Sequence, residues 1–490
     1  MGTLPYRRLL ATGAGAVLLN GCVVGPSYHL PEKALVNSTD AHGAFVEGQD
    51  PELSGAPLPP NWWRLYDDPK LDALVAEALA SNVDLRKATA NLERSRAALR
   101  AVQVLRQPSV AVQGDVERAQ LAGEQYLLPL TPPQDTYYDI GVTVGYDLDL
   151  FGGIRRGIEA AKADDEAVAA ARDLVRVNVA AETARAYADA CGAGLQFLAA
   201  KKSLLLQQES LKLTEQLRQG GRAMDLDVTR SRQLADQLTE VLPVLEGARR
   251  NALYRLATLR GKLPGQFERD LEQCEAPPRI GQPLPIGDGA ALLKRRPDIR
   301  QAERQLAAAT AEIGVATAQL YPDIQIGVPL LSIGSTRDAF TSPTNSWGIG
   351  ATLRWQANQN AARARIAEAQ ASTRLALANF DGVVLNALRE TETALNNYTH
   401  DLKREASTRM ARDDAATVVQ EAQRLQLGGR ATSLDVIDAQ RTLASAEQAL
   451  AQLESAISDD QVAVFLALGG GWEADEGHAQ EARAESSAGP

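Results

Sequence analysis

The sequence predicts a mainly α-helical protein that also carries membrane-type β-strands, with one structural unit present twice. The first observation is a repeated motif: residues 220–228 (GGRAMDLDV) return as residues 428–436 (GGRATSLDV). The repeats lie roughly 210 residues apart, far beyond the period of a solenoid. The second observation is a pair of very long runs with helical character. The third is a set of short segments in which apolar and polar residues alternate.

The long runs span residues 154–219 and 361–427, and neither contains a proline. Roughly 65 residues in a helix form a rod near 100 Å long, at about 1.5 Å per residue. Apolar residues recur in the first run at mixed spacings of three and four, as in Leu195, Leu198 and then Leu204. This narrow apolar seam is typical of a helix that packs against other helices as in a coiled coil.

Each long run ends at a Gly-Gly pair, where glycine can adopt the left-handed backbone that terminates a helix. We expect each rod to reverse there and return as a shorter helix, over residues 225–260 and 433–468. A further helix leads into each half, over residues 71–105 and 289–320. Each half is therefore predicted to be a long helical hairpin preceded by one more helix.

Between the lead-in helix and the rod, each half has two segments with a period of two. They cover residues 110–117, 139–148, 323–328 and 347–355. About ten residues of apolar-out, polar-in alternation are typical of an outer-membrane barrel strand. Soluble hairpins with one face on a core are the alternative. Because the smallest bacterial barrels have about eight strands, four strands cannot close a barrel, and the chain must oligomerise to an order that this argument leaves open.

The N-terminus indicates export and lipidation. Two arginines at residues 7–8 precede a short apolar core, and Gly21 is followed by Cys22. This arrangement predicts a lipoprotein signal peptide over residues 1–21, with diacylglycerol and palmitate on Cys22. The alternative is an ordinary signal peptide with an incidental cysteine. Val23 stands where an aspartate would favour retention in the inner membrane, so we expect the outer membrane.

Composition argues against several functions. The four histidines are scattered without the spacing of metal ligands, and the three cysteines show no close pairing. No glycine-rich phosphate loop follows a strand. The net charge is −11, and the sequence has no stripe of basic residues, so we do not expect nucleic acid as a partner. We therefore expect no enzyme, no metal site and no cofactor other than the lipid.

Several motifs together resemble the outer membrane efflux protein family, the TolC-like channels, and within it the lipoprotein branch typified by OprM. The resemblance covers nearly all of the mature chain. It depends on residues 25–28 (GPSY), 62–63 (WW), 68–71 (DPKL), 82–86 (NVDLR), 293–299 (LKRRPDI), 313–316 (IGVA) and 468–472 (LGGGW).

The resemblance implies a homotrimer with a twelve-stranded barrel in outer-membrane lipid and a periplasmic tunnel of twelve helices. It implies passive export of small toxic compounds in a tripartite efflux pump, with a periplasmic membrane-fusion adaptor and an inner-membrane resistance-nodulation-division pump as partners. The chain departs from the family once: residues 356–360 (QANQN) replace the Phe-Gly turn that residues 151–153 (FGG) form in the first half. We expect a longer or less sharp turn there.

The resemblance also implies a periplasmic gate just after the second Gly-Gly pair. Family residues matching Leu434, Asp438 and Arg441 constrict the periplasmic entrance, and acidic residues matching Asp435 and Asp438 line it. The counterparts in the first half are Asp225, Asp227 and Arg230. The alternative is ordinary capping and surface ion pairs at a hairpin tip, each worth a few tenths of a kcal/mol. If the gate exists, we expect Arg441 to reach a neighbouring chain.

Cys191 and Cys274 are candidates for a disulfide. The periplasm is oxidising, and these are the only two cysteines left once Cys22 is lipidated. Cys191 lies about halfway along the first rod, and Cys274 follows the end of the returning helix at a similar height. Two independent buried thiols are the alternative.

Two other functions share some of these features: the outlet of a type I protein secretion system, against which Cys22 argues, and a periplasmic adaptor lipoprotein, against which the strands argue. The predicted organisation is a signal peptide, an anchored segment over residues 22–70, two repeats over residues 71–287 and 288–472, and a disordered tail over residues 473–490. Within the repeats, the β-hairpins cover residues 108–149 and 322–355, and the helical hairpins cover residues 154–262 and 361–468.

Overall fold

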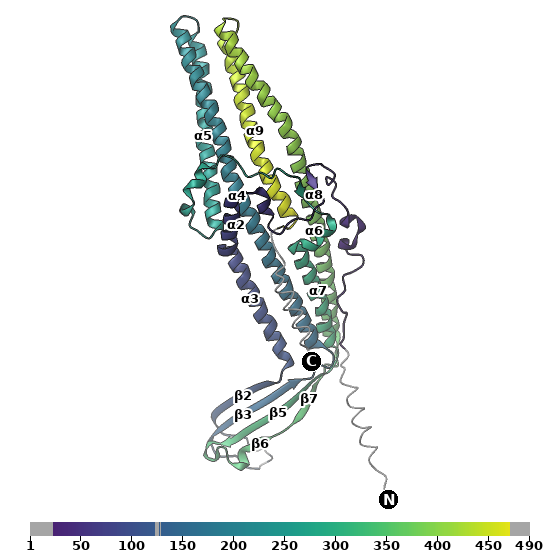
Figure 1. Cartoon of the computed structure of the whole chain (residues 1–490). Helices are drawn as coiled ribbons and strands as arrows, with labels where there is room; N and C mark the ends of the chain where they lie inside the picture. The colour runs from purple at the N-terminus through teal and green to yellow at the C-terminus, as the bar shows by residue number, and fades with distance from the viewer. Residues whose placement is uncertain (1–22, 123–126, 128, 471–490) are drawn as a thin grey trace. The chain divides into compact units, whose positions relative to one another are not determined.

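The structure is a computed structural model that describes residues 23–122, 127 and 129–470, which form two compact units (Figure 1). Each unit draws on both predicted repeats. Within the described part, the first unit contains residues 23–31, 91–169 and 301–380, and the second contains the remainder. The signal peptide, Cys22 and the predicted disordered tail lie outside the described residues.

The long helices agree with the sequence prediction to within a residue or two. The rods are α4 (Gly153–Gln219) and α8 (Asn360–Leu427), and the returning helices are α5 (Asp225–Leu259) and α9 (Ser433–Ala467). Across the ranges that the structure describes, none of the helices is both long and apolar enough to cross a membrane.

The prediction of one continuous lead-in helix per half is wrong. The first is broken at Asn82 into α2 (Pro69–Ser81) and α3 (Val83–Gln103), and the second at Arg296 into α6 (Gly289–Arg295) and α7 (Pro297–Ala318). The Asn82 side chain accepts from the backbone N–H groups of Asp84 and Leu85, so it caps α3 and ends α2. Arg296 has extended backbone because it precedes Pro297.

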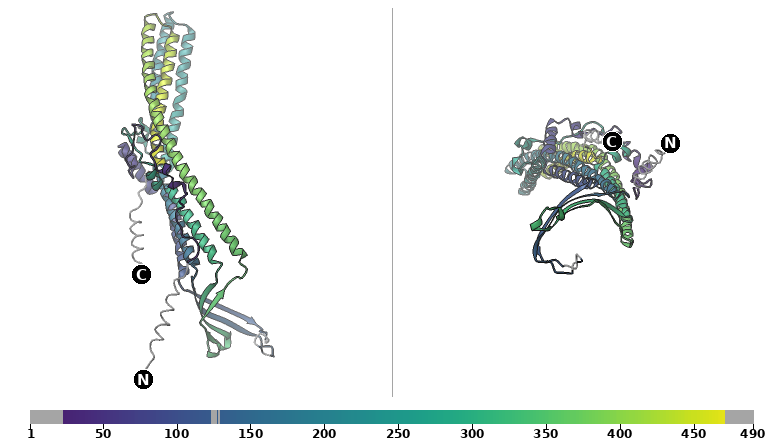
Figure 2. Two further views of the ribbon diagram at one scale, coloured as in Figure 1. Left: turned by 90° about the vertical axis from the view of Figure 1, so that its right-hand side faces the viewer. Right: turned by 90° about the horizontal axis from the view of Figure 1, so that it is seen from below.

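The first unit contains an antiparallel sheet of five strands. They are β2 (Ser109–Ala119), β3 (Asp135–Asp147), β5 (Asp323–Ser335), β6 (Asn345–Trp347) and β7 (Gly350–Arg354). The order is β2-β3-β5, and both β6 and β7 pair with β5. Seen along the view on the right of Figure 2, the strands follow a strongly curved path.

The fourth predicted strand is therefore interrupted. Gly348 donates its N–H to the Pro329 carbonyl at 3.1 Å, while Gly348 and Ile349 leave the ladder. Because Pro329 has no N–H to return, the ladder is locally incomplete there. The described part of the sheet has β2 at one edge and β6 and β7 at the other.

One face of this sheet is apolar and exposed in the single chain. Val110, Val112, Trp347, Ile349 and Leu353 are all at least 61% exposed. Exposed apolar side chains in such a contiguous set mark a surface that is covered in the functional state.

We predicted that the second strand-to-helix connection is longer or less sharp than the first, and the prediction of greater length is wrong. Residues 148–152 join β3 to α4, and residues 355–359 join β7 to α8, so the two connections have equal length. The first uses Gly152 at φ 77°. The second holds its turn differently, with Trp355 Nε1 and Gln359 Nε2 both donating to the Leu320 carbonyl, at 3.1 and 3.2 Å.

The hydrophobic core of the second unit lies around the middle of α4 and α8 and the last turns of α5 and α9. Trp62, in the 3₁₀ helix η4 (Trp62–Tyr66), is fully buried and stacks on Phe465 of α9 with ring centroids 4.7 Å apart. Leu253 of α5 and Leu395 of α8 belong to the same cluster of buried side chains. A short parallel pair, β1 (Leu53–Ser54) and β4 (Leu284–Pro285), joins the segments before and between the repeats.

Candidate functional site

The two helical turns have the same backbone geometry. Gly221 and Gly429 adopt φ 70° and 71°. The N–H of the next residue, Arg222 or Arg430, bonds back to the carbonyl of Leu217 or Leu425 at 2.8 Å in each case. This six-to-one bond is the Schellman termination that only glycine adopts without steric cost.

Two of the predicted gate carboxylates act as helix caps. Asp435 accepts hydrogen bonds from the N–H and the hydroxyl of Thr432, both at 2.8 Å, and these bonds lower the pKa of Asp435. Asp227, at the matching position of the first half, accepts from the Met224 N–H at 3.0 Å and is only 8% exposed. These two side chains therefore stabilise the first turns of α9 and α5.

The other gate residues of the second half lie together on the exposed side of α9. Leu434 is 40% exposed, and the Arg441 and Asp438 side chains are more than half exposed. The Arg441 guanidinium lies 3.7 Å from the Asp438 carboxylate of the same chain, as an i,i+3 pair. Within one chain, the arginine thus contacts its own helix rather than projecting away from it.

The first-half counterparts do not form an equivalent group. Asp225 pairs with Arg218 at the end of α4, at 3.3 Å. Arg230 is half-buried on α5. It occupies the position that Asp438 holds in α9, so the duplication has changed the sign of the charge there.

Cys191 of α4 and Cys274 are joined by a disulfide, with Cα atoms 4.7 Å apart. Cys191 is fully buried. Close approach of the two segments depends on Gly194, where a Cβ atom would lie 2.0 Å from the Cys274 carbonyl oxygen.

Residues 274–280 form a crossbar that joins three helices. The disulfide ties this crossbar to α4. On α9, Gln461 exchanges hydrogen bonds with the backbone N–H and carbonyl of Ile280, both at 3.1 Å. On α8, the Glu405 carboxylate accepts hydrogen bonds from both terminal nitrogens of Arg279, each with an N···O distance of 2.7 Å. These bonds lower the pKa of Glu405. A bidentate pair of this kind is among the strongest side-chain contacts.

Sequence reasoning missed two half-buried carboxyl groups on α9. Burial, with the nearby Asp189 carboxylate as the next cause, raises the pKa of Asp459 to about 7. Burial and Asp401 raise the pKa of Asp460 to about 6, against the opposing charge of Arg185. The signal available in the sequence was the adjacent pair of carboxylates within the apolar last turns of α9.

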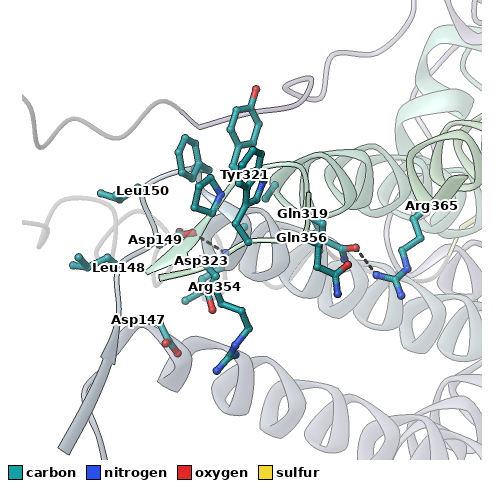
Figure 3. Close-up of a pocket in the computed structure, with 17 residues that line it drawn as sticks. Asp147, Leu148, Asp149, Leu150, Gln319, Tyr321, Asp323, Arg354, Gln356 and Arg365 are labelled. Carbon is teal, nitrogen blue, oxygen red and sulfur yellow. Dashed lines mark hydrogen bonds between the residues drawn. The ribbon is translucent and has the colours of Figure 1, made fainter. Parts of the chain in front are cut away.

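A pocket of about 430 Å³ lies where the strands of the first unit meet its helices (Figure 3). Asp149 accepts from the N–H groups of Ile154 and Arg155 at 2.9 and 2.8 Å, which caps α4. Arg365 of α8 donates to the Gln319 side chain at 2.6 Å. These contacts connect the ends of the strands to the helices. Among the residues that line the pocket, no nucleophile contacts a base.

Residues 23–31, which belong to the first unit, are fixed to its helices α4 and α7. Arg156 of α4 donates to the carbonyls of Val24 and Gly25, at 3.2 and 3.1 Å. The Tyr28 hydroxyl donates to Glu303 of α7 at 2.7 Å, and burial with this bond raises the pKa of Tyr28. Gly25, at φ 84°, packs against the backbone of Gly314. The segment just after Cys22 is thereby held beside the start of α4.

No group of three or more metal-ligating side chains occurs among the residues that the structure describes.

The chain matches the family model of the outer membrane efflux protein twice, over residues 74–262 and 290–470. It is 30% identical over 442 residues to the pyoverdine export outer membrane protein OpmQ of Pseudomonas putida, covering 87% of this chain and 92% of OpmQ. It is 26% identical over 464 residues to nodulation protein T of Rhizobium leguminosarum bv. trifolii, covering 93% and 96%. The solved structure of the outer-membrane channel OprN superposes with a TM-score of 0.85 at 34% identity, covering 92% of this chain and all of OprN.

Proposed function

The chain belongs to the outer membrane efflux protein family and is the outer-membrane channel of a tripartite efflux pump, and we propose that it works as a lipid-anchored homotrimer with a gate at its helical tips. It resides in the outer membrane with a periplasmic extension. It receives small toxic compounds from a membrane-fusion adaptor and an inner-membrane resistance-nodulation-division pump. Transport through it is passive, and the chain carries out no catalysis.

The observation that carries this proposal is the curved sheet with two free edges. Exposed N–H and C=O groups at a sheet edge cannot face lipid. Copies of the chain that join β2 of one to β6 and β7 of the next satisfy both edges at once. Three copies, each with β6 and β7 counted as one interrupted strand, give the twelve-stranded barrel implied by the family.

The lipid on Cys22 is supported by the leader. Because Arg156 and Gly314 fix the residues that follow Cys22, diacylglycerol and palmitate on this cysteine would enter the bilayer beside the strand-to-helix junction. Acyl chains and barrel then supply two anchors, as stable attachment requires.

The gate is proposed at Leu434, Asp438 and Arg441. Exposure of all three on the same stretch of α9 supports this choice. Asp435, Asp227 and Asp225 belong to it only as groups that shape the tips, through their caps and the Arg218 pair. In a symmetric trimer, equivalent side chains meet near one axis.

The test is purification of the full chain from outer membranes, with mass measured by light scattering and conductance in planar bilayers. We expect a mass near three chains, each 52.5 kDa before processing, an acylated N-terminal cysteine, and a small conductance. A monomer that inserts and conducts would contradict the proposal.

A further inference from the structure

A cavity of about 260 Å³ lies among the four long helices of the second unit, at a level between the crossbar and the tips. All four helices contribute to its wall, and they run side by side in both views (Figures 1 and 2). Leu206 of α4, Leu238 of α5, Val419 of α8 and Leu443 of α9 form its apolar surface.

Two buried amides face this cavity with unused hydrogen-bonding groups. Gln207 is 1% exposed; its Nε2 donates to the carbonyl and hydroxyl of Ser231 at 2.9 Å, and its Oε1 has no partner among the described residues. Gln440 is 8% exposed, and neither its Oε1 nor its Nε2 has a partner in the part of the chain described. Buried polar groups are almost always hydrogen-bonded, so such a group indicates a missing partner.

The charges that line the cavity are already paired. Glu447 of α9 accepts from the Ser203 hydroxyl at 2.6 Å and lies 3.8 Å from Lys202. Arg412 of α8 lies 3.1 Å from Asp413, but its buried Nε makes no hydrogen bond in the described part of the chain, so it can donate to a carbonyl oxygen of a ligand. A charged ligand would disrupt one of these pairs without gaining a free counter-charge.

The remaining groups define a ligand by complementarity. Gln207 Oε1 and Gln440 Oε1 need N–H donors, and Gln440 Nε2 needs an acceptor. The leucine and valine side chains of the wall suit a ligand with an apolar group. We propose that this cavity binds small uncharged amides with an apolar side chain, whose N–H and C=O groups pair with Gln440 and Gln207. This site is distinct from the tip gate and extends the function proposed above.

Two predicted consequences follow from the position of Gln440. It directly precedes Arg441 on α9, and Gln207 is on α4, so a bound amide joins these two helices by hydrogen bonds. Any movement of α9 away from α4 then breaks these hydrogen bonds or releases the ligand.

The experiment uses the full chain in detergent and N-acetyl-leucinamide as the probe, with binding followed by calorimetry and ligand-observed NMR. Isoamyl acetate, an apolar ester without N–H donors, is the control compound. We expect saturable binding of the amide, with the ester at least tenfold weaker. Equal binding of both compounds, or none of the amide, would overturn the proposal.

Three variants locate the site. Gln440→Leu removes both unused groups at similar volume and should weaken amide binding at least tenfold. Gln452→Leu, the same change at an exposed position of α9, should leave it unchanged. Ala444→Phe fills the cavity and should abolish binding. It serves as the test if Gln440→Leu fails to fold. Unchanged affinity in a folded Gln440→Leu or Ala444→Phe protein, or a cavity filled by water alone in a structure determined with the amide, would refute the site.

Discussion

At the scale of single residues, chemistry separates carboxylates that look alike in the sequence. Asp435 and Asp438 are three residues apart and both exposed, yet the first accepts hydrogen bonds from Thr432 as a cap and the second pairs with Arg441. Because the Gly-Gly turn and the capping position are local, the sequence predicted the turn correctly. The two carboxylates differ in their partners, the Thr432 cap and the Arg441 guanidinium, and the motif alone did not separate these two roles.

Asp459→Asn should make the protein more stable near pH 8. The folded-state pKa of Asp459, about 7, lies above its ordinary value of 3.8. Between these values the unfolded chain loses the proton while the folded chain keeps it, so stability falls as pH rises from about 4 to about 7. Removing the charge should recover about 1–3 kcal/mol at pH 8 and little at pH 4.

Thermal unfolding of the parent protein and of Asp459→Asn between pH 4 and pH 8 measures this difference in stability. Asp414→Asn, at an exposed position of α8, should show no pH-dependent gain. A gain for Asp459→Asn that is constant with pH would mean that Asp459 ionises normally.

Asp438→Ala and Arg441→Ala should each increase single-channel conductance in planar bilayers. Both remove contacts that we place at the closed constriction, each worth about 1 kcal/mol in a partly solvated site. Adding Leu434→Ala should increase the conductance further. Arg250→Ala, which breaks a similarly exposed pair with Glu246 on α5, should conduct like the parent. If the tip variants do so too, the gate lies elsewhere.

At the scale of elements, the length of the rods was predicted, and the breaks in the two lead-in helices were missed. The absence of proline and the coiled-coil seam predicted the bounds of α4 and α8 to within one residue. The breaks at Asn82 and Arg296 have local signals, the Asn82 side chain that caps α3 and the proline that follows Arg296, and the helical periodicity hid both signals. Contacts distant in sequence then hold the breaks: Asn82 Nδ2 donates to the Leu259 carbonyl, and Arg296 bonds Glu390 and the Ala467 carbonyl.

Arg296→Ala should destabilise the junction of α6 and α7 by about 1–3 kcal/mol, because it leaves the buried Ala467 carbonyl and the mostly buried Asp298 carboxylate without their donor. Its guanidinium bonds Asp298 at 2.6 Å, Glu390 at 2.9 Å and the Ala467 carbonyl at 2.8 Å. Arg389→Ala, whose side chain is 63% exposed, should change stability by under about 0.5 kcal/mol. Denaturant unfolding of both variants makes the comparison, and similar losses would contradict a special role for Arg296.

Two glycine-to-alanine changes should have opposite signs. Gly194→Ala places a Cβ against the Cys274 carbonyl, and the crossbar must shift, at a cost of about 1–3 kcal/mol. Gly247→Ala, in the middle of α5 with nothing within 4 Å of its Cβ, should stabilise by about 0.5–1 kcal/mol. Melting temperatures decide, and a stabilised Gly194→Ala protein would show that the approach to α4 is looser than the structure indicates.

At the scale of the whole molecule, the duplication could be recognised in the sequence, but the two compact units could not. Each unit combines pieces of both repeats, and only tertiary contact defines such a division. The pairing of β3 with β5 joins the two repeats through eleven register partners. The alternation of Ile324 and Ile326 predicted that β5 is a strand, while its partner was beyond what a pattern within one segment can specify.

The free edges of the sheet have a consequence for how the channel reaches its membrane. A single copy carries unsatisfied ladder groups along β2 and along β6 and β7, and a bilayer excludes such edges. Insertion must therefore be an encounter-dependent process, with a rate that rises more steeply than linearly with chain concentration. Refolding into vesicles at a series of dilutions should lose yield abruptly below a threshold, whereas a barrel closed within one chain would insert with a yield independent of dilution.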